Sequence, residues 1–213
     1  MSDLRAGLRR LEKAYFRSGA SRLFAELMSR KARHLYRRVI EDVGPLPVGA
    51  ALADFGCGHG TFLAMYLAEH PGVRGWGIDQ SAELIAFASR QCARQGVSCA
   101  FSVGDLEDPL DAAGPFDVAV SCSSIYCWQD PVAVLDRIHE SLEPGARLLV
   151  YDQLPVRTFR QAHRALFLQR LFGLGLPAWT RGELEGFAAR SRFRGAKVEI
   201  DELIIRLELT KAR

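Results

Sequence analysis

Residues 51–61 read ALADFGCGHGT, and this stretch decides how the rest of the chain is interpreted. It begins with an apolar run that carries Asp54 near its end, which is typical of a buried β-strand. Glycines at positions 56, 58 and 60 follow, and the chain continues into the helix-like segment FLAMYLAEH. Alternate glycines permit the positive φ values of a tight turn and let a ligand approach the backbone. The stretch therefore predicts a strand, a glycine turn and a helix whose first N–H groups can bind a ligand.

The order of residues in this turn resembles the first motif of the class I (Rossmann-like) methyltransferases that use S-adenosylmethionine (SAM). In that family a D/E-x-G-x-G-x-G string wraps the amino-acid end of the cofactor. A nicotinamide dinucleotide site would show G-x-G-x-x-G instead, and position 61 is threonine. A purely structural glycine turn is the alternative interpretation. The resemblance implies SAM as the cofactor and assigns its binding to Asp54, Gly56, Cys57, Gly58 and Gly60.

Asp79 ends the next apolar segment, VRGWGI, about 20 residues beyond the glycines. A carboxylate at the end of a second strand can accept two hydrogen bonds from the diol of a ribose. By resemblance to the second methyltransferase motif, Asp79 binds the ribose and Gln80 lies beside it. The alternative is that Asp79 and Ser81 cap the helix that follows.

The third apolar segment, VSCAFSV, runs into Gly104, Asp105 and Leu106. In the family that this chain resembles, an acidic residue here meets the adenine amino group, and the amide of the next residue faces the ring. The resemblance assigns these roles to Asp105 and Leu106. An aspartate in an ordinary turn is the alternative.

The fourth strand is predicted from the apolar run FDVAVSCSS at 116–124, with Ser121 as a cofactor contact near its end. DNA and protein amide N-methyltransferases of related fold carry Asn/Asp-Pro-Pro-Tyr/Phe at this place, whose polar groups bind a planar amine, whereas this chain has Ser-Cys-Ser-Ser. Cytosine C5 methylation needs a Pro-Cys nucleophile, and the sequence contains no Pro-Cys dipeptide. Both classes are therefore disfavoured.

The segment SIYCWQDP that follows resembles small-molecule methyltransferases, in which an aromatic-rich loop precedes an Asp-Pro helix start. The resemblance implies that Tyr126 and Trp128 line the opening through which the methyl group passes. We expect a small, apolar or aromatic acceptor that is methylated on O, N or C. Tyr126 and His163 are the candidate catalytic residues, and Tyr15 and His163 are further candidates for substrate binding.

The predicted architecture is an α/β three-layer sandwich with N-terminal helices. Its sheet has seven strands, mostly parallel, with an antiparallel last strand. Residues 1–44 are predicted to form a helical lid and residues 45–213 a methyltransferase domain. An insertion at about 154–180 contains a basic amphipathic helix, which we interpret as a wall of the substrate pocket. Plain packing and contact with a membrane surface remain open for this helix.

Composition suits a single globular domain, because the chain has 213 residues and 48% of them are hydrophobic. Five cysteines without C-x-x-C spacing indicate free thiols rather than disulfides or a zinc site, so no metal is expected. Cys57, Cys122 and Cys127 leave a thiol-based metalloid methylation open. Residues 1–20 lack the apolar centre of a signal peptide, and we expect a cytoplasmic monomer or homodimer.

Charge is distributed unevenly along the chain. Residues 1–50 contain 11 basic and 5 acidic residues, residues 51–155 contain 5 and 14, and residues 156–213 contain 12 and 6. Solvated helix faces explain the basic flanks most simply, although flanks that close over the acidic centre or meet an anionic partner remain open. Two rival functions follow, a SAM-binding protein without turnover and, less favoured, a nucleic-acid methyltransferase.

Overall fold

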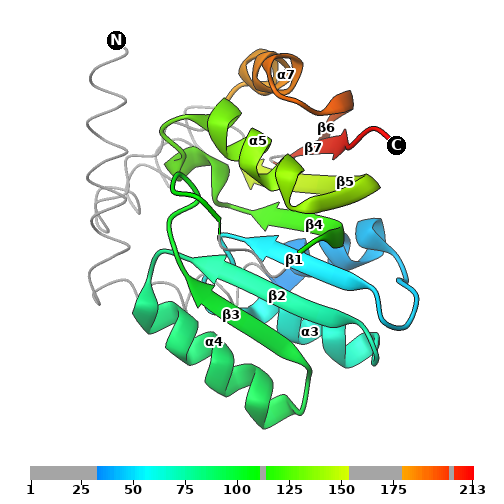
Figure 1. The fold of residues 1–213 in the computed structure, drawn as a ribbon, viewed down its shortest axis with the longest axis vertical. Coiled ribbons are helices and arrows are strands. Elements are labelled where there is room, and N and C mark those ends of the chain that lie inside the picture. The colour runs from blue at the N-terminus through cyan, green and yellow to red at the C-terminus, as the bar shows by residue number, and fades with distance from the viewer. Residues whose placement is uncertain (1–32, 111–113, 154–178, 202–203) are drawn as a thin grey trace.

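The computed structural model describes residues 33–110, 114–153, 179–201 and 204–213 (Figure 1). Most of the predicted lid and of the predicted insertion, including Tyr15 and His163, lies outside these residues. The boundaries predicted for these two regions therefore stay predictions.

The described residues form a seven-stranded sheet in the order β3-β2-β1-β4-β5-β7-β6. All neighbouring pairs from β3 to β5 are parallel, and β7 pairs antiparallel with both β5 and β6. The predicted fold is thereby confirmed. The strands are β1 (Ala51–Phe55), β2 (Arg74–Asp79), β3 (Cys99–Val103), β4 (Phe116–Cys122), β5 (Leu142–Gln153), β6 (Arg194–Asp201) and β7 (Ile204–Thr210).

Helices connect these strands, and capping residues in the sequence determine where the helices begin and end. Ser81 caps α4 by accepting a hydrogen bond from the Leu84 amide, and Gly96 ends it in the left-handed conformation. Asp130 caps α5, with Pro131 in its first turn. Residues 33–43 are also helical. The other helices are α3 (Thr61–Glu69), α4 (Ala82–Gln95), the 3₁₀ turn η1 (Ile125–Cys127), α5 (Pro131–Glu140) and α7 (Arg181–Arg190).

The central strand β1 is buried on both faces, and its residues alternate between two cores. Ala53 and Phe55 face the core that is shared with α5 and α7, whereas Leu52 faces the core that is shared with α3 and residues 33–43. Successive strand residues point to opposite faces, so a central strand of a three-layer arrangement is buried at every position. Since β1 to β5 are parallel, their carboxyl ends lie at one edge of the sheet.

Polar contacts hold residues 33–43 against the face of the sheet that α3 also covers. The Tyr151 hydroxyl donates to Asp42 at 2.5 Å, and Arg206 lies 3.5 Å from the same carboxylate. Arg147 donates to the Val43 carbonyl at 3.2 Å. These contacts fix the helix that leads into β1.

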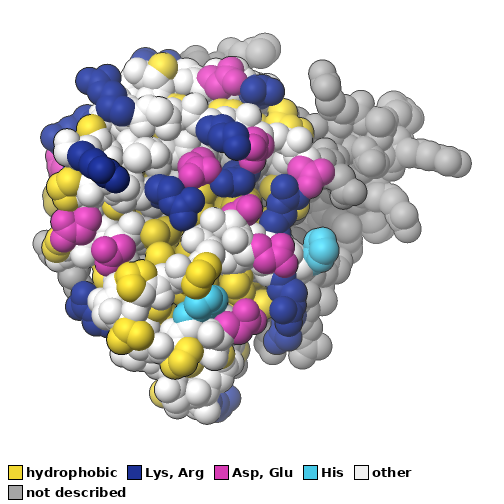
Figure 2. All heavy atoms as spheres, turned by 90° about the vertical axis from the view of Figure 1, so that its right-hand side faces the viewer, with side chains coloured by type: hydrophobic (Ala, Val, Ile, Leu, Met, Phe, Trp, Pro, Cys, Tyr) yellow, Lys and Arg dark blue, Asp and Glu magenta, His cyan; other side chains and the backbone are white. Residues whose placement is uncertain are grey.

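Charged side chains of both signs are interspersed on the face of the molecule seen in Figure 2. Ion pairs among the described residues include Arg192 with Glu140 at 2.5 Å and Lys197 with Glu199 at 2.5 Å. Within the described residues, no helix is both long and apolar enough to cross a membrane.

Candidate active site

The glycine turn lies between β1 and α3, at the carboxyl edge of the sheet (Figure 1). Gly56, Gly58 and Gly60 all have positive φ, at 82°, 53° and 70°. The amides of Gly56 and Cys57 both donate to the carbonyl of Ile78, at 2.9 and 3.0 Å. The turn is therefore bent over the end of β2, in a conformation that side chains other than glycine rarely adopt.

The three glycines serve different purposes. A Cβ on Gly56 would stand 2.2 Å from the Ser124 hydroxyl oxygen, and one on Gly60 would stand 2.8 Å from the Cβ of Ala88. A Cβ on Gly58 would meet no atom of the described residues within 4 Å. Gly56 and Gly60 are thus required by packing within the protein, whereas Gly58 presents bare backbone to open space that a ligand can enter.

Asp79 points toward this turn from the end of β2. Its Oδ2 accepts from the Gly58 amide at 3.0 Å, and its Oδ1 accepts from the Ser81 amide at 2.9 Å. The helix cap itself is Ser81, so Asp79 supports the cap without supplying it. Burial raises the pKa of Asp79, although its two backbone hydrogen bonds oppose the shift. Each oxygen keeps a lone pair for a further donor.

Asp54 lies deeper, at the end of β1. It is 2% exposed, and its Oδ1 has no hydrogen-bond partner among the described residues. Burial, and to a lesser degree the Asp79 carboxylate, raises the pKa of Asp54 to about 8. A buried carboxyl group with an unused oxygen fits a ligand that carries a positive charge.

The end of β3 completes this half of the site. The Gly104 amide donates to the Asp79 carbonyl at 3.0 Å, and Leu106 is buried. Asp105 accepts from the Glu107 amide at 3.1 Å, which is the turn contact that the alternative interpretation expected. The Gln80 side chain has a buried Oε1 without a partner among the described residues. The carboxyl ends of β1, β2 and β3 therefore bring most of the predicted cofactor residues together.

Ser121 occupies a different environment from the other predicted cofactor residues. It is fully buried in β4, and its hydroxyl donates to the Phe55 carbonyl at 2.8 Å. This bond ties the end of β4 to the end of β1. Its hydroxyl proton is therefore already used within the protein, and direct cofactor contact by Ser121 stays a prediction.

After β4, the backbone is strained at Ser123, and hydrogen bonds then fix the residues that follow. Ser123 has a φ of 51°, which is uncommon for a residue with a side chain and often marks a functional site. Ser124 accepts from the indole nitrogen of Trp128 at 3.1 Å, so Trp128 is tied back across η1. Trp128 is only 3% exposed and packs within the core, whereas Tyr126 in η1 is half-buried. The predicted contact of both residues with a substrate stays a prediction.

Sequence reasoning missed Trp179. Its indole nitrogen donates to the Ile125 carbonyl at 3.0 Å, and its ring meets Phe187 of α7 edge-on, with centroids 4.7 Å apart. The signal that was available is an aromatic residue directly before the capping box Thr180-x-x-Glu183, a place where apolar side chains pack against the helix that follows. Its contact with η1, across 54 residues, has no counterpart in sequence spacing.

Two further residues near the site were also missed. Tyr36, from the helix before β1, packs against Phe62 with ring centroids 6.3 Å apart, and burial together with Cys122 and Asp54 raises its pKa. Glu107 accepts from the amides of Gln129 and Asp130, the latter at 3.0 Å. Glu107 thereby links the turn after β3 to the start of α5.

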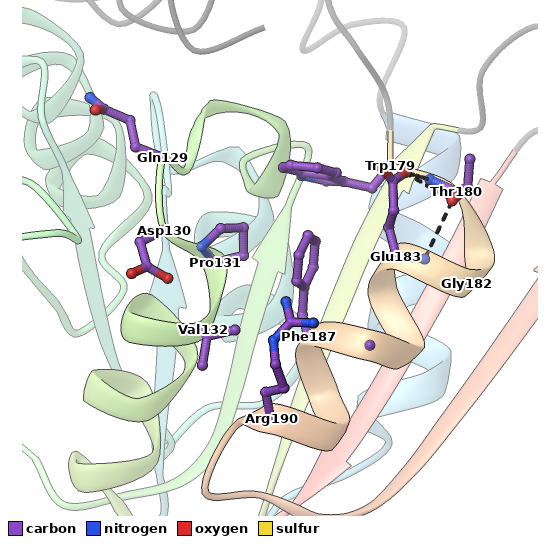
Figure 3. A pocket seen from close by; sticks show the side chains of 11 residues that line it. Gln129, Asp130, Pro131, Val132, Trp179, Thr180, Gly182, Glu183, Phe187 and Arg190 are labelled. Atoms are coloured by element: carbon purple, nitrogen blue, oxygen red, sulfur yellow. Dashed lines mark hydrogen bonds between the residues drawn. The ribbon is translucent and has the colours of Figure 1, made fainter. Parts of the chain in front are cut away.

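A hollow of about 700 Å³ lies between the starts of α5 and α7 (Figure 3). Figure 3 shows Trp179 and Phe187 on one side of it, Pro131 and Val132 on the other, and the hydrogen bonds between Thr180 and Glu183. The hollow is therefore lined both by aromatic rings and by polar groups at the helix ends.

Other groups considered for chemistry lie in less suitable surroundings. His139 packs edge-on against Phe193, and burial and Lys211 lower its pKa. Burial raises the pKa values of the Cys57 and Cys122 thiols well above their ordinary range, which disfavours thiolate chemistry there. In the part of the chain that the structure describes, no three His, Cys, Asp or Glu side chains are grouped so as to hold a metal ion.

Comparison with known proteins agrees with this geometry. Residues 53–148 match a family described as a methyltransferase domain. The chain is 33% identical over 107 residues to phosphoethanolamine N-methyltransferase 1 of Triticum aestivum, covering 50% of this chain and 21% of that protein. It is 30% identical over 135 residues to trans-aconitate 2-methyltransferase of Deinococcus radiodurans, covering 63% of this chain and 49% of that protein. The chain thus spans half or less of the length of these two relatives.

A solved structure shares the fold at lower identity. Phosphoethanolamine N-methyltransferase 2 of Haemonchus contortus, in complex with phosphomonomethylethanolamine and S-adenosylhomocysteine, superposes with a TM-score of 0.69 and 16% identity. The superposition covers 85% of this chain and 53% of that one. The two chains therefore have the same sheet architecture.

Proposed function

We propose that the protein transfers a methyl group from SAM to a small-molecule acceptor, and the match of residues 53–148 to a methyltransferase domain supports this proposal. The observation that carries the proposal is the open space over Gly58, which lies between a buried carboxyl group with an unused oxygen and a carboxylate held by the turn itself. A structural turn has no need of that space or of that unused oxygen.

The residues at this edge fit the cofactor group by group. The backbone at Gly58 would lie against the amino-acid end, and Asp54 would face its positive charge. The remaining lone pairs of Asp79 would accept the two ribose hydroxyls. Gly104 would let the ring approach the chain, Leu106 would cover it, and Asp105 would accept from its amino group. Gln80 would lie at the rim between ribose and ring.

Bound SAM supplies a methyl group that is electrophilic because the sulfur beside it is positive. The contribution of the protein is then to align the acceptor and to exclude water. Ser124, Trp128 and Trp179 hold η1 in place by hydrogen bonds of 3.0–3.1 Å, so Tyr126 is presented from a fixed turn. Tyr126 and His163 are our candidates to accept a proton from a hydroxyl or ammonium acceptor.

The acceptor is proposed as a small molecule with apolar or aromatic character. The names of the two relatives also specify small-molecule acceptors, phosphoethanolamine and trans-aconitate. Trp179 and Phe187 beside η1 support an apolar neighbour for the acceptor, with Tyr15, Tyr126 and Trp128 as further candidates for contact. The methylated atom, whether O, N or C, follows from the acceptor.

Radiolabelled SAM tests the proposal directly. The full chain is incubated with SAM labelled in its methyl group and with separate sets of phenols, amines and carboxylic acids, and the labelled product is measured by chromatography. We expect transfer to at least one set, at a rate that depends on the acceptor concentration. Tight binding of SAM without transfer to any set would support a non-catalytic SAM-binding protein instead.

A further inference from the structure

Asp54 has an unusual set of neighbours for a carboxyl group that is 2% exposed. Among the described residues, the titratable groups that interact with it electrostatically are Asp79 from β2, Cys57 from the glycine turn, Cys122 from β4 and Tyr36 from the helix before β1. Cys99 of β3 is a more distant member of the same group. Each of these side chains is either neutral or negative, so none balances a negative charge on Asp54.

The two carboxyl groups differ in what surrounds them. Asp79 accepts one backbone N–H on each oxygen, whereas Oδ1 of Asp54 has no partner among the described residues. A buried carboxylate without a counter-charge is costly, and such a group normally keeps its proton. When two carboxyl groups share a site, the one with fewer donors is the one that remains protonated.

We propose that Asp54 acts as a proton switch: it is a neutral carboxylic acid in the empty site and releases its proton when a cationic ligand enters over Gly58. The proposal rests on the proposed function, since the ligand is SAM or its product. The O–H bond of Asp54 breaks, the proton passes to the solvent, and the carboxylate that remains pairs with the positive charge of the ligand.

Proton release links affinity to pH. Because binding expels a proton, the affinity for the ligand rises as pH rises toward the pKa of Asp54, by up to about tenfold per pH unit, and levels off above it. That pKa is about 8 in the empty site, so the dependence covers the neutral range. The ligand's own amino group begins to lose its proton near pH 8, which opposes the rise there.

Isothermal titration of the full chain with S-adenosylhomocysteine at pH 6.5 tests the switch. At this pH the amino group of the ligand is already protonated, so a released proton comes from the protein. The titration is repeated in buffers of different ionisation enthalpy, and the slope of the observed heat against that enthalpy counts the protons. We expect a release close to one proton per ligand, and a tenfold gain in affinity between pH 5.5 and 6.5.

Asp54→Asn is the matched variant, because it keeps the shape and removes the proton. We expect it to bind more weakly and to release no proton. Release of a full proton by this variant would overturn the assignment to Asp54, and wild-type heat that is equal in all buffers would overturn the switch while leaving the proposed function intact. No heat in any buffer would instead count against the proposed function.

A second measurement covers the case in which the variant does not fold. The infrared difference spectrum of the wild-type chain, with and without S-adenosylhomocysteine, reports carboxyl groups directly. The switch predicts that binding removes the stretch of a protonated carboxyl group and adds a carboxylate band. A spectrum without that loss contradicts it.

Discussion

The carboxyl edge of the sheet has two halves that are built in different ways. On the β1–β3 side, backbone amides and two carboxyl groups make the site, and Asp79 holds the turn 21 residues before it. On the β4–β5 side, side chains from distant segments meet, as when Trp179 reaches Ile125 across 54 residues. Glu107 joins the halves through the amide of Asp130.

This difference matches what each half has to do. A cofactor shared by many enzymes can be held by backbone and by two carboxyl groups, and a short motif encodes such a site. An acceptor specific to one enzyme requires side chains, and these come from wherever the chain returns to the edge. Substitutions in the first half should therefore weaken binding of the cofactor. Substitutions in the second half should lower the stability of the protein or its affinity for the acceptor.

The largest effect is expected for Asp79→Ala, which removes the acceptor for the ribose. Hydrogen bonds to a charged group contribute about 1.5–3 kcal/mol each, so losing two should weaken S-adenosylhomocysteine binding by at least about 100-fold. Isothermal titration measures this loss. Asp117→Ala is the control, because Asp117 also accepts a backbone amide, that of Ala51 at 2.8 Å, near the start of β1. Equal losses for both variants would contradict the ribose role.

The glycines of the turn allow a sharper contrast. Gly58→Ala adds a methyl group to open space and should weaken S-adenosylhomocysteine binding by at least about tenfold, at a stability cost of about 1–2 kcal/mol for the left-handed backbone. Gly56→Ala should cost about 1–3 kcal/mol more, because its methyl group overlaps the Ser124 hydroxyl that holds Trp128. Urea denaturation and titration separate the two. A Gly58→Ala protein that binds normally would show that no ligand lies there.

On the other half, Trp179→Phe removes the donor to the Ile125 carbonyl while keeping a ring against Phe187. A buried carbonyl left without its donor costs about 1–3 kcal/mol, so the free energy of unfolding should fall by that amount. Affinity for S-adenosylhomocysteine should change less than about threefold, since distant sites are close to independent. A large loss of that affinity would mean that the two halves are coupled.

Asp54→Asn should stabilise the empty protein in a pH-dependent way. The pKa of Asp54 is raised by folding to about 8, so the folded chain holds a proton that the unfolded chain loses above about pH 4. The wild type therefore loses stability as pH rises from 4 to 8, and asparagine does not. We expect a gain of at least about 1.4 kcal/mol at pH 8, which is the free energy of a single pKa unit, and little gain at pH 4. A gain that is equal at both pH values would contradict the assignment.

The smallest effect is expected for Glu185→Ala. Arg181 and Glu185 form an exposed pair one turn apart on α7, at 2.8 Å. Such pairs contribute about 0.3–0.5 kcal/mol, so the change in unfolding free energy should stay near that value. A loss above 1 kcal/mol would show that α7 depends on more than the packing of Trp179 and Phe187.

The sequence was sufficient for the first half because its residues act locally. Asp54 and the glycines lie in one motif, and Asp79 follows at the interval that one helix and one strand require. The helix starts at Ser81 and Asp130 were readable for the same reason. The positions of these residues can be predicted from their spacing along the chain.

The contacts of the second half could not be predicted from the sequence, because they depend on how distant segments pack. The hydroxyl of Ser121 can bind either a cofactor or a neighbouring strand, and only the pairing of β4 with β1 brings it to Phe55. The resemblance predicted that Trp128 lines the opening for methyl transfer, but its burial in the core and its hydrogen bond to Ser124 depend on packing that no motif encodes. Tyr36 lies near the site because its helix packs on α3, and the sequence alone does not indicate this packing.

A crystal structure of the full chain with S-adenosylhomocysteine tests the central claim most directly. We predict that the ribose hydroxyls bind the carboxylate of Asp79, that the amino-acid end covers Gly58, and that the positive amino group faces Asp54. A ligand bound elsewhere, with the space over Gly58 filled by the protein's own side chains, would contradict the account.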